Sequence, residues 1–83
     1  MNFVFSKHSL EQMERRGIRK DTVENVLTKP EQTKTYNGKK VYQSVIKSED
    51  KNYLIRVFVN TKTNPKLVIT VYLTSKIKKY YES

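Results

Sequence analysis

Apolar residues follow a helical period in the first third of this chain and an alternating period afterwards. Over residues 6–28 they recur every three or four positions, which is typical of amphipathic helices. The pattern predicts a first helix over residues 6–16 that ends at Gly17, and a second helix over residues 20–28 that is closed by Pro30. Both helices are short, so neither is expected to persist in isolation.

The starts of both predicted helices carry candidate capping residues. Ser6 precedes the first helix and offers its hydroxyl as an N-cap. At the second helix, the spacing of Asp21 and Glu24 resembles a capping box, and Arg19 is an equally placed cap residue.

From Glu31 onward the apolar positions alternate, which predicts β-strands. The pair Asn37-Gly38 is the strongest hairpin signal, because a type I′ turn needs positive φ at both central positions. The alternation predicts strands over residues 32–36, 39–47 and 53–60, a fourth strand from residue 66, and polar loops over residues 48–52 and 61–65. Such short connections favour antiparallel pairing.

The stretch over residues 66–80 is the most apolar part of the chain at its start and a basic tail at its end. Alternation along this strand places one set of side chains on each face: Leu67, Ile69, Val71 and Leu73 on the first, and Val68, Thr70, Tyr72 and Thr74 on the second. The strand over residues 53–60 has the same asymmetry, with Arg56 on its more polar side. If the helices cover the more apolar face, the reverse face displays Arg56, Thr70, Tyr72 and Thr74.

These elements predict an α+β fold, in which two N-terminal helices pack on a four-stranded antiparallel sheet and a short C-terminal helix follows over residues 75–81. A chain of 83 residues can bury one small core. Residues 1–83 are therefore expected to form a single domain.

The charge of the chain indicates the chemistry of its partner. Seventeen Lys and Arg residues against eight Asp and Glu residues give a formal net charge of +9. This surplus favours a partner rich in phosphate, with nucleic acid first, whereas an acidic protein or an anionic membrane surface would use the same charge. A solubilising coat of lysines is the remaining interpretation.

Composition also argues against several classes of site. The chain has one His, no Cys, two Gly and scattered carboxylates, so no metal site, glycine-rich phosphate loop or cofactor is expected. No apolar run is long enough for a signal segment or a membrane span, which favours a cytoplasmic protein with no membrane partner.

Two motifs resemble those of a known family. FSKHSLEQMERRGI is similar to an F-[ST]-x-H-A-x-x-R-M-x-x-R-G-I signature, and ITVYLTSKIKKY is similar to an I-T-x-Y-x-T-S-K-x-x-K-Y signature. Arg56 within YLIRVFV and a V-x-x-V-L-x-x-P pattern in the second helix also fit. The motifs look like a family of small, largely uncharacterised bacterial domains, itself similar to the BrnT toxins and, more remotely, to the RelE/ParE toxin superfamily.

This resemblance implies a RelE-like fold, a toxin of a toxin–antitoxin system and an antitoxin protein as partner. Members of RelE type are mRNA endoribonucleases, whereas ParE-type members are not, so the fold alone does not settle activity. Carried over by position, the family residues fall on His8, Arg16, Arg56, Tyr72, Thr74, Ser75 and Lys76. Gln12 stands where the family has its first helix arginine, and Arg15 on the same side of the helix is a candidate substitute.

Cleaving RNA without a metal requires a base for the 2′-hydroxyl, an acid for the leaving oxygen and positive charge at the phosphorane. His8 is the candidate base or acid, because imidazole titrates near neutral pH. Arg56 is the candidate for holding two phosphate oxygens, Arg16 or Lys76 for adding charge, and Tyr72 for supplying a phenolic proton. The candidate substrate-binding residues are Arg15, Thr70, Thr74, Ser75 and Lys79.

Each of these residues also has a structural explanation. His8 can cap or solvate a helix start, and Arg56 can form an ion pair with Glu24 or Glu31. Tyr72 can simply cover the sheet, and residues 76–79 can be a solvated tail. Two hypotheses therefore stand: a metal-independent endoribonuclease that acts on RNA, free or on a ribosome, and a non-catalytic module that binds nucleic acid or protein through the same basic face.

Overall fold

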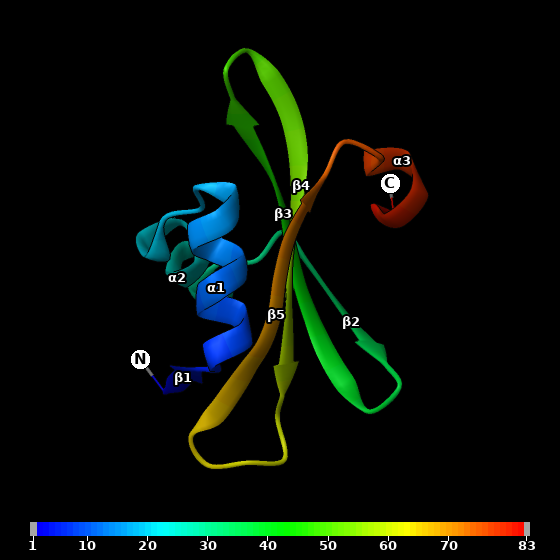
Figure 1. Cartoon of the computed structure of the whole chain (residues 1–83). Coiled ribbons are helices and arrows are strands. Elements are labelled where there is room, and N and C mark those ends of the chain that lie inside the picture. Colours follow the sequence, from blue (N-terminus) through cyan, green and yellow to red (C-terminus); the bar gives the residue numbers. More distant parts are fainter. Residues whose placement is uncertain (1, 83) are drawn as a thin grey trace.

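The computed structural model describes residues 2–82 and confirms the α+β class, with a sheet of five strands (Figure 1). Its elements in chain order are β1 (Phe3–Phe5), α1 (Lys7–Arg16), α2 (Lys20–Thr28), β2 (Gln32–Tyr36), β3 (Lys39–Ser48), β4 (Lys51–Asn60), β5 (Lys66–Thr74) and α3 (Ile77–Tyr80). The strands lie in the order β1-β5-β4-β3-β2. Residues 1 and 83 of the expected single domain lie outside the described residues.

The sheet is mixed, so the prediction of a four-stranded antiparallel sheet is wrong. Strands β2 to β5 pair antiparallel as expected, but β1 adds a parallel partner to β5, with Phe3 opposite Lys66 and Phe5 opposite Val68. Three residues are too few to show alternation, and their partner lies at the other end of the sequence. No local signal could therefore reveal this strand.

The predicted boundaries of the first two helices are confirmed. Ser6 caps α1 by accepting a hydrogen bond at its hydroxyl from the backbone N–H of Ser9, at 3.0 Å. Gly17 ends α1 in the left-handed region at φ +66, where glycine carries no steric penalty. At α2, Arg19 occupies the cap position without a side-chain cap, and its guanidinium instead binds Asp21 at 2.9 Å.

The two hairpins at the ends of β3 differ in how well the sequence predicts them. Asn37 and Gly38 have φ of 49 and 76, as a type I′ turn requires. The expected polar loop over residues 48–52 is instead a tight turn, because Glu49 and Asp50 also adopt positive φ, at 50 and 66. Strands β3 and β4 therefore extend almost to the turn.

Helices α1 and α2 lie together on one side of the sheet, and α3 lies on the other (Figure 1). The apolar core fills the space between the first two helices and the sheet. It is formed by Met13, Ile18, Val23, Val26, Leu27, Tyr42, Ile55, Val57, Val59, Val68 and Val71. Arg56 alternates with Ile55 and Val57 along β4 and so points to the opposite face, as predicted.

Strand β5 carries one residue more than β4 along their shared ladder. Thr70 and Val68 pair with successive residues of β4, and Ile69 is left out of the register. This bulge shifts the alternation by one position, so Val68 joins Val71 on the helix-covered face and is fully buried there. The prediction that Val68 shares the face of Thr70 and Tyr72 is therefore wrong.

Candidate functional site

Arg56 occupies the centre of the sheet face that α1 and α2 leave uncovered. It lies in the middle of β4, opposite Gln43 on β3 and Tyr72 on β5. Only 8% of its surface is exposed. Because β4 is a central strand, the neighbouring strands hold this side chain on both sides.

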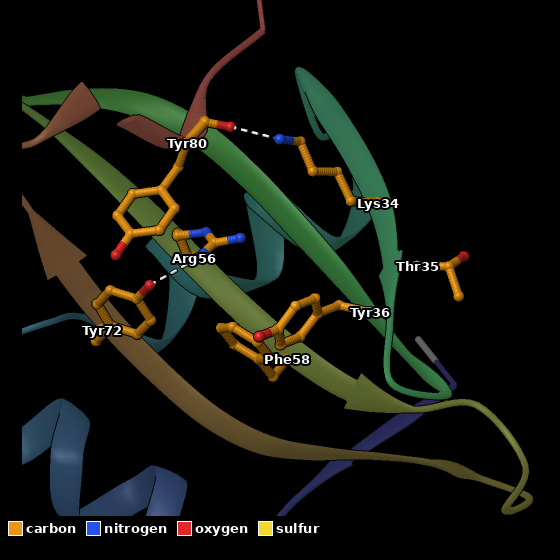
Figure 2. A pocket seen from close by; sticks show the side chains of 7 residues that line it. All are labelled: Lys34, Thr35, Tyr36, Arg56, Phe58, Tyr72 and Tyr80. Atoms are coloured by element: carbon orange, nitrogen blue, oxygen red, sulfur yellow. Dashed lines mark hydrogen bonds between the residues drawn. The ribbon is translucent and has the colours of Figure 1, made fainter. Parts of the chain in front are cut away.

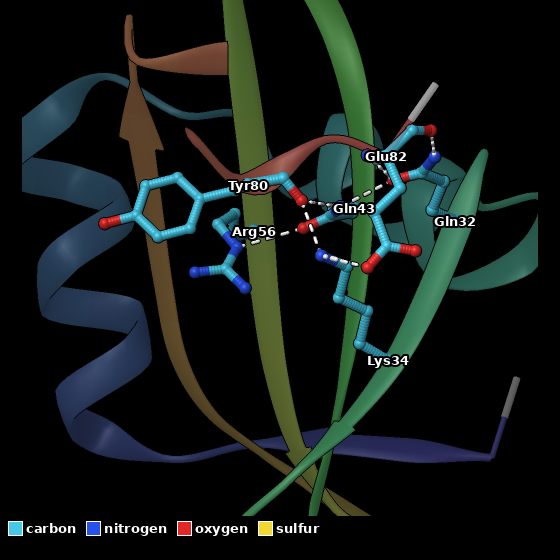
Figure 3. Close-up of polar contacts among 6 residues, drawn as sticks. All are labelled: Gln32, Lys34, Gln43, Arg56, Tyr80 and Glu82. Carbon is cyan, nitrogen blue, oxygen red and sulfur yellow. Dashed lines mark hydrogen bonds and ion pairs between the residues drawn. The ribbon is translucent and has the colours of Figure 1, made fainter. Parts of the chain in front are cut away.

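Two neutral groups orient the guanidinium. Its Nε donates a hydrogen bond to Gln43 Oε1 at 3.0 Å, and its Nη1 donates to the Tyr72 hydroxyl at 2.7 Å. Gln43 is itself fully buried and donates from its amide nitrogen to Gln32 Oε1 at 2.8 Å and to the Tyr80 carbonyl at 3.1 Å (Figure 3). The network thus fixes the plane of the Arg56 fork.

Aromatic rings surround the same guanidinium. The Arg56 Cζ lies 4.2 Å from the centroid of the Tyr80 ring and 5.2 Å from that of Phe58. The rings of Phe58 and Tyr72 stack with centroids 6.0 Å apart and an interplanar angle of 24°. Such contacts stabilise a cation without neutralising its charge.

Arg56 has no carboxylate partner within residues 2–82, so the predicted pair with Glu24 or Glu31 is wrong. Glu31 instead accepts a hydrogen bond from the backbone of Val45 at 3.2 Å. The Glu31 carboxylate raises the pKa of the Tyr81 phenol above its usual value, first through side-chain hydrogen bonding and also through its negative charge. A buried guanidinium without a counter-ion is costly and attracts an anion.

The side chains around Arg56 enclose a hollow of about 410 Å³, which we name the Arg56 hollow (Figure 2). Its lining residues are Lys34, Thr35, Tyr36, Arg56, Phe58, Tyr72 and Tyr80. Lys34 adds a second cation, whose Nζ donates to the Tyr80 carbonyl at 2.7 Å and lies 3.2 Å from Glu82 Oε1. The hollow therefore combines flat apolar walls with positive charge.

Three of the other predicted cations, Arg15, Arg16 and Lys76, lie near the C-terminal end of α1. Arg16 and Lys76 line a hollow of about 520 Å³, the Lys76 hollow, together with Thr74 and Ser75. Arg15 and Arg16 also line a small hollow of about 80 Å³, the edge hollow, which Tyr72 shares. Seven of the ten predicted site residues thus line three neighbouring hollows.

His8 stands apart from these hollows and lines none of the three. Its side chain is exposed, and Ser6, not His8, caps α1. The sequence predicts that either the ring of His8 or the fork of Arg16 reaches the cleft of Arg56. The structure does not bring His8 there, and Arg16 lines the adjoining edge hollow. Thr70 shares the face of Arg56 without lining the hollows, and Lys79 is exposed with its Nζ 5.3 Å from the Tyr80 ring centroid.

Several residues of the site escaped sequence reasoning. Gln43 had a readable signal, because it stands between Val41 and Val45 on one face of its strand, where a large polar residue is as informative as Arg56 in its own strand. Tyr80 had none, because its ring meets Arg56 only when α3 folds back across the sheet. Lys34 had none, because it comes to the same hollow only through the pairing of β2 with β3. The expected helix over residues 75–81 is shorter, since Thr74 Oγ1 binds the backbone N–H of Lys76 and the helix starts at residue 77.

Gln12, which replaces a family arginine, has a structural role. Its Oε1 accepts a hydrogen bond from the backbone N–H of Val71 at 3.0 Å. β1 pairs with β5 only as far as Val68, so the amide of Gln12 satisfies a group that no strand reaches.

The described residues set limits on other chemistry. Within residues 2–82, no three His, Cys, Asp or Glu side chains gather where they could hold a metal ion. None of the three helices is long and apolar enough to cross a membrane. The arrangement around Arg56 suits the binding of an anion that carries a flat ring.

Fold and site together define a small α+β domain with an aromatic hollow around a buried arginine. The chain belongs to a family described as a domain of unknown function, DUF4258, whose model matches residues 5–73. Comparison with curated proteins and with solved structures found no match. The likeness to BrnT and RelE/ParE toxins stays a prediction.

Proposed function

We propose that this domain binds single-stranded RNA, with a phosphate at Arg56 and a base against the aromatic walls. The observation that carries the proposal is a buried guanidinium without a carboxylate partner among the described residues, at the base of an aromatic hollow. Nη2 and the second N–H of Nη1 make no hydrogen bond to the described residues. They are available for two oxygens of one phosphate.

The rings favour a nucleotide over an acidic peptide. Tyr36 is 61% exposed, and with Phe58 and Tyr72 it offers flat surface for stacking, which is worth about 1–3 kcal/mol per base. A hollow of about 410 Å³ is within the usual size range of small-ligand sites. The net charge of +9 would add long-range attraction for a polyanion.

The test is binding of a fluorescein-labelled oligouridylate of about eight nucleotides, a length within the usual footprint of single-strand sites. Fluorescence anisotropy would compare the wild type with the variants Arg56→Met and Arg19→Met. Arg19 is exposed, and its replacement removes the same single positive charge as that of Arg56. We expect Arg56→Met to weaken binding about 10- to 100-fold and Arg19→Met to change it little, because charge-assisted hydrogen bonds are lost only in the first variant.

A duplex of the same length is the second arm of this test. Bases in a duplex are not free to enter the hollow, so its affinity should be lower than that of the single strand. Equal losses in the two arginine variants, or equal affinity for duplex and single strand, would show that binding follows net charge and would overturn the proposal.

A second candidate function is RNA cleavage of RelE or BrnT type. It is favoured by the Tyr72 hydroxyl, which accepts a hydrogen bond from Arg56 and keeps its own proton to donate. In this mechanism the 2′-hydroxyl attacks the phosphorus and passes its proton to water, while the Arg56 guanidinium stabilises the phosphorane. Tyr72 protonates the 5′-oxygen as its bond to phosphorus breaks, and water then returns a proton to the phenolate. His8 lines none of the three hollows and takes no part.

Cleavage would be detected as products with a 2′,3′-cyclic phosphate that form in the presence of a chelator. Tyr72→Phe should lower the rate by about 10²–10⁴ and leave RNA affinity nearly intact, as expected for a general acid, whereas His8→Ala should leave the rate unchanged. Loss of activity in the His8 variant would overturn this assignment of roles. The absence of cleavage, alone or with ribosomes, would leave RNA binding as the function.

If the domain is a toxin, an antitoxin would cover its basic face. A cytoplasmic location also stays a prediction. We propose an acidic partner protein, because a carboxylate can occupy the same fork of Arg56 as a phosphate. A partner of this kind should compete with RNA and lose affinity for Arg56→Met. Simultaneous binding of partner and RNA would contradict the proposal that both bind at Arg56.

A further inference from the structure

We propose that one RNA strand runs from the Arg56 hollow around the edge of β5 to the Lys76 hollow, so that the ligand is a chain of about four or more nucleotides. The inference rests on the proposed function, which needs only one nucleotide at Arg56. It adds the path and the length of the ligand.

The three hollows form a connected series. Tyr72 lines both the Arg56 hollow and the edge hollow, so one side chain forms a wall of each. Arg16 in turn lines both the edge hollow and the Lys76 hollow. A strand that leaves the Arg56 hollow past Tyr72 therefore meets the two arginines of α1 next.

The path changes from one face of the sheet to the other. The Arg56 hollow lies on the face away from α1 and α2, whereas Tyr53 and Leu73 of the Lys76 hollow share their face with Ile55 and the helices. The change of face occurs at β5, because β1 covers the edge of β5 only as far as Val68 in the described residues.

The edge of β5 is closed to a further strand but open to side-chain contacts. The backbone N–H of Val71 already donates to Gln12 Oε1, and the carbonyl of Ile69 already accepts a hydrogen bond from the Ser6 hydroxyl at 3.1 Å. A partner that binds here cannot use β-strand pairing at these groups. Arg15, which is exposed beside them, remains available to a phosphate.

Charges along the path favour a polyanion. The cations are Lys34, Arg56, Arg15, Arg16 and Lys76. Two carboxylates oppose them: Glu82, paired with Lys34, and Glu49 in the Lys76 hollow. Positive charge thus exceeds negative charge along the path. The path also has an aromatic ring at each end, Tyr72 in the Arg56 hollow and Tyr53 in the Lys76 hollow.

The experiment compares two lengths of 5′-phosphorylated, 3′-labelled oligouridylate, a dinucleotide and an octanucleotide, by anisotropy over a range of salt. The test variant is Arg16→Gln/Lys76→Gln. The matched control is Lys7→Gln/Lys62→Gln, two exposed lysines that line none of the three hollows and carry the same loss of charge. Urea unfolding of each variant verifies that it is folded.

We expect the test variant to bind the octanucleotide about 10-fold or more weakly, with the slope of log affinity against log salt reduced by about 1.4, because two phosphate contacts are lost. Its affinity for the dinucleotide should be unchanged. The control variant should bind both RNAs nearly as the wild type does.

The other outcomes separate the inference from the proposed function. The path would be overturned if the test and control variants lost the same affinity for the octanucleotide. It would also be overturned if the test variant bound the octanucleotide as tightly as the wild type. If Arg56→Met still weakens both RNAs in that case, binding at the Arg56 hollow stands. If Arg56→Met leaves the dinucleotide affinity unchanged, the proposed function itself fails.

Discussion

The two faces of the sheet differ in what holds them together. The face under α1 and α2 is stabilised by buried aliphatic side chains such as Ile55, Val57 and Val71, which are fully buried. The opposite face buries Arg56 and Gln43 beside the aliphatic residues Leu54 and Val41, and its cover is one short helix that buries no residue of its own. One face is built from apolar burial, and the other combines a smaller apolar contribution with hydrogen bonds and ring contacts around Arg56.

This difference separates stability from binding. Apolar burial supplies most of the free energy of folding and needs no particular ligand. A guanidinium buried with neutral partners contributes little to stability, and replacing such groups with apolar ones is often neutral or favourable. The helix-covered face should therefore govern unfolding, and the Arg56 face should govern ligand affinity.

The largest effect is expected from Ile55→Ala on the helix-covered face. Ile55 is fully buried within the core, so the variant should lose about 2–5 kcal/mol of unfolding free energy, measured by urea denaturation. RNA affinity of the folded fraction should stay unchanged. A loss below about 1 kcal/mol would mean that the core relaxes around the cavity and that the two faces differ less than proposed.

Gln43→Leu should have the next largest effect, about 1–3 kcal/mol of destabilisation, because it leaves the Nε of a buried guanidinium without its acceptor. The double variant Gln43→Leu/Arg56→Met should recover part of that loss, since the unsatisfied charge is gone. Urea denaturation of both single variants and the double variant gives the coupling energy. Strict additivity would show that Gln43 does not act through Arg56.

Tyr80→Leu should cost about 1 kcal/mol, because the ring above the guanidinium is lost. Tyr80→Phe keeps the ring and the backbone carbonyl that binds Lys34 and Gln43, so it should match the wild type. Thermal unfolding of the pair would check this. If the phenylalanine variant is as unstable as the leucine variant, the phenolic hydroxyl matters and the ring does not.

The smallest effect is expected from Lys34→Met. Its partner Glu82 has a side chain that is 79% exposed, and ion pairs in contact with water contribute less than about 1 kcal/mol. The unfolding free energy should therefore change little, even at low salt. A larger loss would show that the C-terminal segment depends on this contact.

Local signals made part of this structure predictable. Ser6, Gly17 and the pair Asn37-Gly38 each impose a backbone geometry on their neighbours, and the elements they bound were predicted correctly. The alternation that placed Arg56 and Tyr72 on one face is also local, because it acts within each strand. Predictions of this kind need no knowledge of distant residues.

The predictions that were wrong depended on distant partners. The bulge at Ile69 is defined by the register of β5 against β4, and β1 is a strand only because it pairs with β5. Tyr80 meets Arg56 only after the chain has crossed the sheet. The position of His8 relative to Arg56 likewise depends on where α1 docks, and helical periodicity contains no such information.

The contact between β1 and β5 also bears on how the chain folds. The Ser6 hydroxyl and the Ile69 carbonyl that bind each other are 63 residues apart in sequence, whereas β3 and β4 are joined by a tight turn. Loop closure over such a distance is costly and slows folding. The hairpins of β2 to β5 are expected to form first, so pulsed amide exchange should find β4 protected earlier than β1. The first helix would then assemble on a sheet that already exists.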